Sequence, residues 1–465
     1  MKRSDVLRLA LLCGAQFLLV LDVVVVNVAL PSISADLDVS PARLPLVSIS
    51  YTLTFGALLV VFGRAGDLFG RRRLFVAGLC VFGLASLLTG AAAGPVMLFT
   101  GRALQGLGAA MVSPAALALL LDSFRDRDLR NRAMGMWGAV GSAGAIVGQA
   151  VGGTLVTAAG WRSVFLINVP LAILMAAGSK NLVELAARSG KIIDLGGAVL
   201  LAGSVTAIAA SLVLIAELDF DFSTGVLLLA SVALGIWLWR HERRHPAPLL
   251  DSKLLSNRVA RLGNVVLATN AGLTMAALYF TTLYLQNVLG MSAMAVGLAF
   301  TPVTAIVLCV SPVTGRLISR YGVRPPLAAG AVAGCAGLVQ LSRVPVDGTY
   351  LADVLPGLSL VAVMGGLSYA AAYVAGTDGV PPDGEGLASG LLNTAQELGA
   401  ALGLAAISAL ALVIGSSPVE SYRAGFVVAA GTAAFTLWVS LRLPRETGRV
   451  ARGSRPAEVE LEEVR

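Results

Sequence analysis

Apolar runs about as long as a lipid bilayer is thick recur along the whole chain. The first extends from Leu9 to Leu30 and contains one acidic residue, Asp22. A helix needs roughly 20 apolar residues to cross the hydrocarbon core. Fourteen such runs are delimited at residues 9–30, 46–63, 74–92, 96–120, 134–158, 163–179, 194–216, 222–239, 262–288, 293–314, 326–342, 351–374, 388–413 and 422–441. The sequence therefore predicts an all-α membrane protein with 14 transmembrane helices.

The composition favours this class and excludes a soluble globular protein. Hydrophobic residues occupy 57% of the 465 positions, charged residues only 13%, and the mean hydropathy is +0.83. A soluble chain of this length would contain fewer hydrophobic and more charged residues. Lys2, Arg3 and Arg8 precede the first run as they would a secretory signal, but this run is longer than a signal core and further spans follow. We expect a retained helix.

The positive charges predict the orientation in the membrane. If the amino terminus is cytoplasmic, Arg102 falls within a span and only four of the 34 Lys and Arg residues lie at the outer face, namely Arg43, Arg162, Arg343 and Arg423. This asymmetry follows the positive-inside rule and places both termini in the cytoplasm of a multi-pass plasma (inner) membrane protein. It also accounts for the net charge of +7, so no nucleic-acid partner is expected.

Residue types that usually carry metal or catalytic chemistry give no signal of a site. The four cysteines all fall in apolar runs, and His241 and His245 share one charged loop. Neither a disulfide framework nor a metal site is expected. Asp194 lies at a span end, and no specific function is predicted for it. Because no nucleophile-base pair or phosphate-binding loop appears, we expect neither an enzyme nor a cofactor.

Two loop sequences indicate an internal duplication. Residues 63–73 read GRAGDLFGRRR and residues 315–324 read GRLISRYGVR, at an offset of 252 positions. Three glycines of one span recur in another at an offset of 255: Gly135, Gly144 and Gly148 as Gly390, Gly399 and Gly403. Glycine-rich helices resemble one another anyway, but two nearly equal offsets favour a duplicated unit.

The duplication predicts a 6 + 2 + 6 arrangement of spans. The expected units are an N-terminal six-helix half at residues 1–190, a two-helix insertion with a cytoplasmic linker at 191–258, a C-terminal six-helix half at 259–443, and a disordered cytoplasmic tail at 444–465. Paired repeats of this kind are common in secondary transporters, whose substrate sites lie near the midplane between the halves.

Several motifs resemble the major facilitator superfamily, and in particular its fourteen-span drug/proton antiporter family. Residues 63–73 resemble the signature loop between spans 2 and 3, residues 21–31 (LDVVVVNVALP) the first-span motif, and residues 98–108 (LFTGRALQGLG) the fourth-span motif. Trp161-Arg162 and Asn168-Val-Pro170 extend the resemblance over most of the chain. It implies the major facilitator fold and transport by alternating access.

Asp22 and Arg102 are the expected proton-coupling pair. A carboxylate deep in a bilayer is costly and usually marks a proton, ion or substrate path. The helical rise places Asp22 about 12 Å and Arg102 about 9 Å below the outer ends of their spans, and the resemblance implies that both spans line the central cavity. A movement that separates or hydrates the pair would change the proton affinity of Asp22. The alternative is a static ion pair that braces two helices.

Glu397 is the second acid predicted within a span, about 13 Å from the cytoplasmic end. Its repeat partner, Ser142, is uncharged, so the duplication alone does not explain it. We expect it to join proton coupling or to bind a cationic substrate; the alternative is a glutamate solvated in the cavity without function. Asn27, Gln105 and Gln149 are expected to line the substrate cavity, with helix packing as the alternative for the first two.

The loop at residues 63–73 is expected to gate the inner face. Arginines at a span end can act simply as stop-transfer charges, but that role requires neither an acid nor glycines at fixed spacing. The resemblance implies that the acid engages charged and helix-terminal groups across the two halves in the outward-facing state. The expected gating residues are Gly63, Asp67, Gly70, Arg71 and Arg72.

The functional hypothesis is proton-coupled efflux of small amphipathic or cationic organic compounds, as in a multidrug or antibiotic exporter. One alternative is a dedicated exporter of a single metabolite or self-made antibiotic. Another is a transporter-like receptor or scaffold that moves nothing. The expected partners are protons, a small-molecule substrate and the lipid bilayer.

Overall fold

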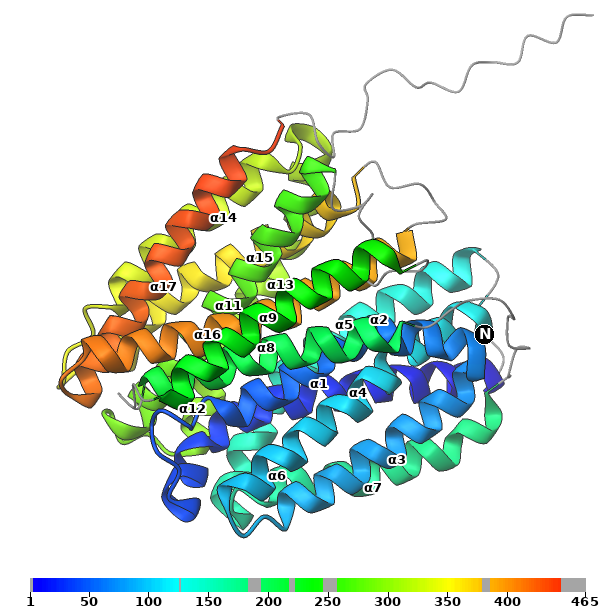
Figure 1. Ribbon diagram of the computed structural model, residues 1–465, viewed down its shortest axis with the longest axis horizontal. Coiled ribbons are helices and arrows are strands. Elements are labelled where there is room, and N and C mark those ends of the chain that lie inside the picture. The colour runs from blue at the N-terminus through cyan, green and yellow to red at the C-terminus, as the bar shows by residue number, and fades with distance from the viewer. Residues whose placement is uncertain are drawn as a thin grey trace, which may run out of the picture.

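The computed structural model describes residues 3–124, 127–182, 194–216, 222–245, 257–378 and 385–444. Every regular element within these ranges is a helix (Figure 1). The predicted tail, apart from Pro444, and most of the predicted cytoplasmic linker lie outside them.

The first group of helices is called here the amino-terminal bundle. It consists of α1 (Arg3–Leu37), α2 (Leu46–Phe69), α3 (Arg71–Gly90), α4 (Pro95–Ser123), α5 (Arg127–Ala159), α6 (Ser163–Leu166), α7 (Asn168–Gly178) and η1 (Ser179–Asn181). Helix α4 packs against α2 and α3, and α1 packs along α5. Pro95 stands at the start of α4, where its missing N–H leaves no helical bond unmade.

The last group of helices is called here the carboxy-terminal bundle. It consists of α11 (Arg258–Asn287), α12 (Ala293–Ala299), α13 (Thr301–Tyr321), α14 (Arg324–Leu341), η2 (Tyr350–Val354), α15 (Leu355–Gly376), α16 (Glu385–Ile414) and α17 (Pro418–Leu441). Helix α11 packs against α15, α16 and α17. The Asn257 side chain caps α11 by accepting hydrogen bonds from the backbone N–H groups of Val259 and Ala260.

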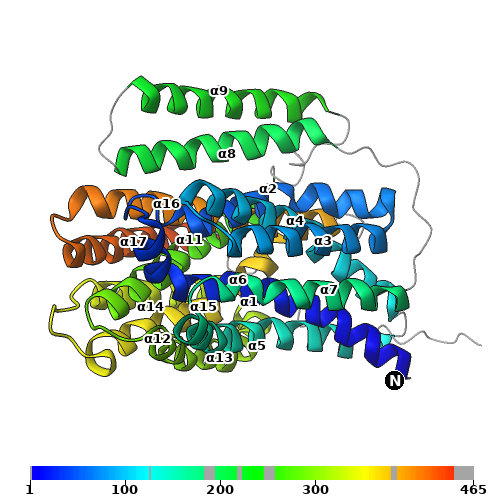
Figure 2. The ribbon, with the colours of Figure 1, turned by 90° about the horizontal axis from the view of Figure 1, so that it is seen from below.

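Helices α8 (Leu195–Ala216) and α9 (Phe222–Arg244) form a separate outer layer, which Figure 2 shows on top of the two bundles. Helix α8 packs against α2 and α16, one helix from each bundle, whereas α9 packs chiefly against α8. The outward side of α9 exposes Leu229, Val232 and Trp237, as expected of a surface that meets lipid. Helix α9 extends beyond its predicted end at residue 239, so His241 lies in its last turn and not in a loop.

Nine helical segments in the described ranges are long and apolar enough to cross a membrane. Three shorter apolar helices lie at Val147–Ala159, Ser163–Gly178 and Val199–Leu212. Length and hydropathy alone thus support a multi-pass, all-helical membrane protein, and the count of fourteen spans stays a prediction.

Each copy of the duplicated loop has a glycine with positive φ at the end of its first helix. Gly70 ends α2 with φ 96°, and Gly322 ends α13 with φ 82°. Both values lie in the region that favours glycine. The recurring glycines of the spans also have equivalent contacts: Gly144 and Gly148 place α5 on α1, while Gly399 and Gly403 place α16 on α11. These equivalent packings support the predicted duplication.

The two bundles meet through close contacts between helices. Helix α2 packs against α16, and α5 packs against α12. A Cβ at Gly297 of α12 would clash with the backbone carbonyl of Gln149 on α5, so this crossing needs a glycine. The Gln286 side chain of α11 donates a 2.9 Å hydrogen bond to the Val28 carbonyl of α1.

Candidate functional site

Asp22 lies in the interior of the amino-terminal bundle, with 1% of its surface exposed. Its Oδ2 accepts a 2.7 Å hydrogen bond from Arg102, which is equally buried. Its Oδ1 accepts hydrogen bonds from the side-chain amides of Asn168 (2.6 Å) and Gln105 (3.2 Å). The carboxylate of α1 is therefore held by donors from α4 and α7 and is positioned as a fully partnered anion.

Arg102 has further partners besides the carboxylate. Its Nε donates to the carbonyl of Val47 at 3.0 Å, and its Nη1 also donates to Oε1 of Gln105 at 3.0 Å. The guanidinium lies 4.5 Å from the centre of the Tyr51 ring and 5.7 Å from that of Phe165. Ring faces attract cations, so the charge of Arg102 is stabilised from α2 and α6 as well as from Asp22.

Gln105, which was predicted to line a substrate cavity, belongs to this network. Its side chain is fully buried, and its Nε2 donates to Oγ of Ser86 at 2.8 Å as well as to Asp22. A side-chain amide has both donors and an acceptor, which lets Gln105 contact both members of the ion pair.

Arg102 has two hydrogen-bond acceptors that would remain if Asp22 were protonated. A proton on the carboxyl group would weaken its charge-assisted bond with Arg102. The guanidinium would still have the Val47 carbonyl and Gln105 as acceptors, both already within 3.0 Å. Arg102 would therefore keep two neutral acceptors beside a neutral Asp22, although its charge would lose the anion that balances it.

Glu397 lies on α16 where the two bundles meet. A Cβ at Gly56 of α2 would stand 2.6 Å from the Cβ of Glu397, so the glycine lets the acid approach the opposite bundle. Glu397 also lies within electrostatic range of Tyr51, Tyr369 and Tyr373. Because Tyr51 also stacks on Arg102, this one side chain lies between the Asp22 network and Glu397.

Several buried polar atoms near the bundle interface have no hydrogen-bond partner within the described ranges. They include both amide atoms of Asn270, the hydroxyl of Thr394 and Oε1 of Gln149. Such atoms are costly unless water or a ligand satisfies them. Gln149 has this unpartnered oxygen at a buried position, whereas Asn27 accepts a 3.4 Å hydrogen bond from Ser48 within its own bundle.

A cavity of about 870 Å³ opens between the bundles at the end of α1. Pro31 and Ser34 of α1 line one side, and Tyr279 and Asn287 of α11 line the other, with Tyr422 of α17 beside them. The size suits a small organic molecule. Neither Asp22 nor Glu397 lines this cavity.

The loop after α2 is held within its own bundle. Arg71 pairs with Asp122 at the end of α4, and Gly63 lies against Pro114 of α4. Arg72 is partly buried at the start of α3. The side chain of Asp67, the predicted latch, lies outside the described part of the structure, as does that of Ser142.

Sequence reasoning missed several members of the site. Asn168 entered only as part of a short motif, although it makes the shortest hydrogen bond to Asp22. Ser86 and Tyr51 were not singled out. A polar residue in an apolar run, such as Asn168 or Ser86, is the signal that could have identified them, because a buried polar group needs a partner.

Comparison with known proteins identifies the family of this chain. Residues 12–404 match the profile of the Major Facilitator Superfamily. Puromycin resistance protein pur8 of Streptomyces alboniger is 37% identical over 415 residues, covering 86% of this chain and 80% of the relative. Cephamycin export protein CmcT of Amycolatopsis lactamdurans is 36% identical over 449 residues, covering 94% and 91%.

Two further similarities extend this result. Multidrug resistance protein Stp of Mycobacterium tuberculosis is 32% identical over 415 residues, covering 88% of this chain and 76% of the relative. Among solved structures, the POT family transporter PepTSo superposes with a TM-score of 0.68 at 14% identity, covering 95% of this chain and 97% of that one. The structural match shows a shared fold.

Proposed function

Because this chain belongs to the Major Facilitator Superfamily, we propose that it exports small amphipathic or cationic organic compounds in exchange for protons, by alternating access. Export is supported by the relatives, which are named for puromycin resistance, cephamycin export and multidrug resistance and match most of the chain. It is a transporter and not an enzyme.

The buried Asp22–Arg102 pair is the observation that carries proton coupling. The bond between them is 2.7 Å long and both side chains are shielded from solvent. In such a site the charged carboxylate depends on the guanidinium, and a shift of α1 against α4 would alter its affinity for a proton. Arg102 would then rely on Val47 and Gln105, so protonation and helix movement become linked.

The substrate is proposed to bind between the bundles, close to Glu397. An acid within electrostatic range of Tyr51, Tyr369 and Tyr373 suits an organic cation, because a carboxylate attracts positive charge and aromatic rings nearby can add to that attraction. Asn270 of α11, whose amide has no partner among the described residues, could bind polar groups of the substrate. The cavity beside Tyr279 and Tyr422 would be the outer vestibule.

The proposed topology has fourteen spans in the plasma (inner) membrane, with both termini in the cytoplasm. The nine long segments, the three shorter apolar helices, α9 and α14 would make up these spans. The N-terminal half at residues 1–190 and the C-terminal half at residues 259–443 would rock about the interface, with the two-helix insertion at residues 191–258 outside. Asp67, Gly63, Gly70, Arg71 and Arg72 would form the inner gate.

Transport in inside-out vesicles tests this proposal. Puromycin, a cephamycin and a lipophilic dye cation would be supplied with and without an imposed pH gradient. We expect gradient-dependent uptake by the natural protein, none with Asp22→Asn, and a selective loss of cation transport with Glu397→Gln. If Asp22→Asn transports at the normal rate under the gradient, Asp22 is not the coupling site.

A dedicated exporter of one antibiotic is the second candidate. It is favoured by the two most similar relatives reported above, each of which is named for a single antibiotic. Resistance measured across unrelated compounds separates the two: a broad pump protects against several classes, whereas a dedicated exporter protects against one.

A further inference from the structure

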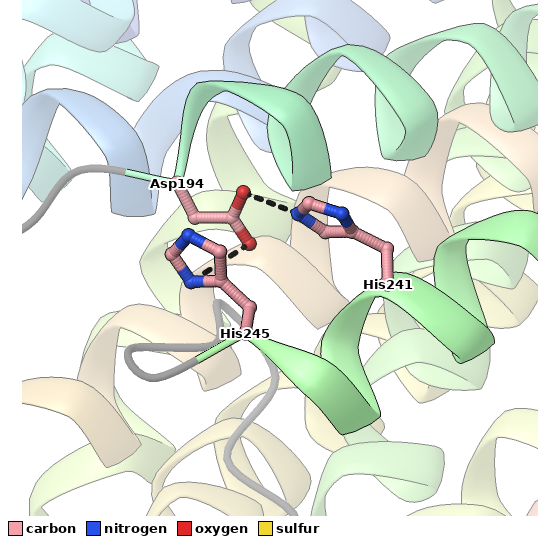
Figure 3. A group of neighbouring side chains, drawn as sticks. All are labelled: Asp194, His241 and His245. Atoms are coloured by element: carbon pink, nitrogen blue, oxygen red, sulfur yellow. Dashed lines mark hydrogen bonds and ion pairs between the residues drawn. The ribbon is translucent and has the colours of Figure 1, made fainter.

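Three side chains of metal-ligand type converge where α8 begins and α9 ends (Figure 3). Nε2 of His241 lies 2.7 Å from Oδ1 of Asp194, and Nδ1 of His245 lies 3.7 Å from Oδ2. The two imidazole rings stack with centroids 5.2 Å apart. All three candidate ligand atoms lie within 4.8 Å of one another.

The sequence spacing supports a site at this position. Residues 241–245 read HERRH, so the two histidines are four residues apart. On a helix this spacing puts both rings on one face, and His-Glu-x-x-His is a known zinc-binding pattern in that context. Helix α9 ends at Arg244, and the backbone N–H of the next residue, His245, still donates to the His241 carbonyl with helical spacing.

The carboxylate of Asp194 is buried, so its negative charge needs a nearby donor or cation. Asp194 is 1% exposed, and its Oδ1 accepts a 2.7 Å hydrogen bond from the backbone N–H of Gly197. Its Oδ2 accepts no hydrogen bond from any described residue, because the 3.7 Å separation from His245 is too long for one. A buried carboxylate oxygen without a donor is costly, and a bound cation would satisfy it.

A second carboxylate increases the negative potential here. Oε1 of Glu242 and Oδ2 of Asp194 both lie within 3 Å of the position that a Cβ would occupy on Gly197. The glycine thus leaves room for two acids on one side of the cluster. Arg243, between the histidines in sequence, instead places its guanidinium 4.1 Å from the centre of the Trp239 ring.

The three candidate ligand atoms are close enough to surround one metal ion once the side chains rotate. Metal–ligand bonds of 2.0–2.2 Å in a tetrahedron place ligand atoms about 3.3 Å apart. The separations of 2.7 and 3.7 Å are to different oxygens of Asp194, and all three candidate ligand atoms lie within 4.8 Å of one another, so the side chains would rotate to reach the tetrahedral spacing. We propose that Asp194, His241 and His245 bind a divalent transition metal of the zinc class, with a fourth position open to water.

Such a metal would join the two outer helices at one end. Helix α9 packs chiefly against α8, and the cluster lies at the end of the molecule that also holds the chain's amino terminus (Figure 2). The metal would fix the end of α9 to the start of α8. This role is separate from the proposed export, since the site lies in neither bundle.

Metal binding by the full-length purified protein tests the proposal, without any measurement of transport. The protein would carry a purification tag free of histidine, because the chain has only two histidines of its own. We expect the natural protein to bind about one Zn²⁺ per chain, and His241→Ala, His245→Ala and Asp194→Asn each to weaken binding by about tenfold or more. Arg243→Gln, in the same helical turn, is the matched control and should bind normally.

Spectroscopy and stability give independent readouts. Co²⁺ in the natural protein should show the visible absorption of a tetrahedral nitrogen and oxygen site, without the near-ultraviolet band of a thiolate. Zn²⁺ should raise the melting temperature of the natural protein and of Arg243→Gln, but not of the histidine variants. If His241→Ala does not fold, His241→Gln serves instead, since it can still hydrogen-bond Asp194.

Two results would overturn the inference. One is a natural protein that binds no Zn²⁺ at micromolar concentrations. The other is binding that persists in the histidine variants or shows a thiolate band, which would assign the metal to the cysteines.

Discussion

Removing the charge of Asp22 should destabilise the protein far more than removing the charge of an exposed aspartate on the same helix. In Asp22→Asn, Arg102 keeps its place, 1% exposed, but loses its anionic partner. Breaking a buried ion pair by changing one partner typically costs about 3–5 kcal/mol, because the other charge stays buried without compensation. The matched control is Asp36→Asn: Asp36 pairs with Arg162 at 2.6 Å, with both side chains well exposed.

The double variant Asp22→Asn, Arg102→Gln tests whether the loss of stability in the single variants comes from an unbalanced buried charge. Asp22→Asn keeps the size of the side chain and Arg102→Gln keeps a shorter polar one, so the double variant contains no buried charge without a partner. We expect it to regain at least about 2 kcal/mol relative to the sum of the single variants. Stability would be measured by reversible unfolding in mixed detergent micelles. Asp36→Asn should remain within experimental error of the natural protein.

Two outcomes would refute this reasoning. If Asp22→Asn is as stable as Asp36→Asn, the buried pair is not a strong interaction. If the double variant loses the full sum of the single effects, the two residues are not coupled. Transport by a stable double variant then decides the role of the pair: restored pH-driven export would make it a static brace, whereas lost export with restored stability supports proton coupling.

Three further predictions concern positions around this network. Tyr51→Phe should keep near-normal transport because the ring still covers Arg102, whereas Tyr51→Leu should lose about 0.5–2 kcal/mol of stability and much of its transport rate. Gly322→Ala should cost about 1–2 kcal/mol, since the positive φ there disfavours a Cβ; thermal unfolding checks this. Gly297→Val should lose about 1–3 kcal/mol and impair transport, because its side chain would push α12 from the Gln149 carbonyl; unfolding with vesicle uptake tests it.

The membrane class of this chain follows from its sequence, because runs such as 9–30 can be stable in lipid only as helices. The loop motif at residues 63–73 and its copy at 315–324 indicated an internal duplication, and both loops have a glycine with positive φ. Helix ends were less predictable. Helix α9 continues through charged residues past residue 239, since arginines at a span end can extend into the polar layer without breaking the helix.

From the sequence alone, only the site residues that are unusual for their apolar surroundings could be predicted. Asp22 and Arg102 stood out because charges are rare in apolar runs, and their contact is present at 2.7 Å. Asn168 and Tyr51 did not stand out, because their roles depend on which helices pack together. The histidines were read as loop residues, and only the return of α9 to the start of α8 brings them to Asp194.

All described hydrogen-bond donors to Asp22 come from the amino-terminal bundle, whereas Glu397 and Asn270 belong to the carboxy-terminal bundle. This separation has an evolutionary consequence. Under the proposed assignment of Glu397 and Asn270 to the substrate, mutations at these positions would change recognition without removing any described donor to Asp22. A lineage could therefore diversify its chemical repertoire by exchanging the gene segment beyond α9, while inheriting the other segment intact.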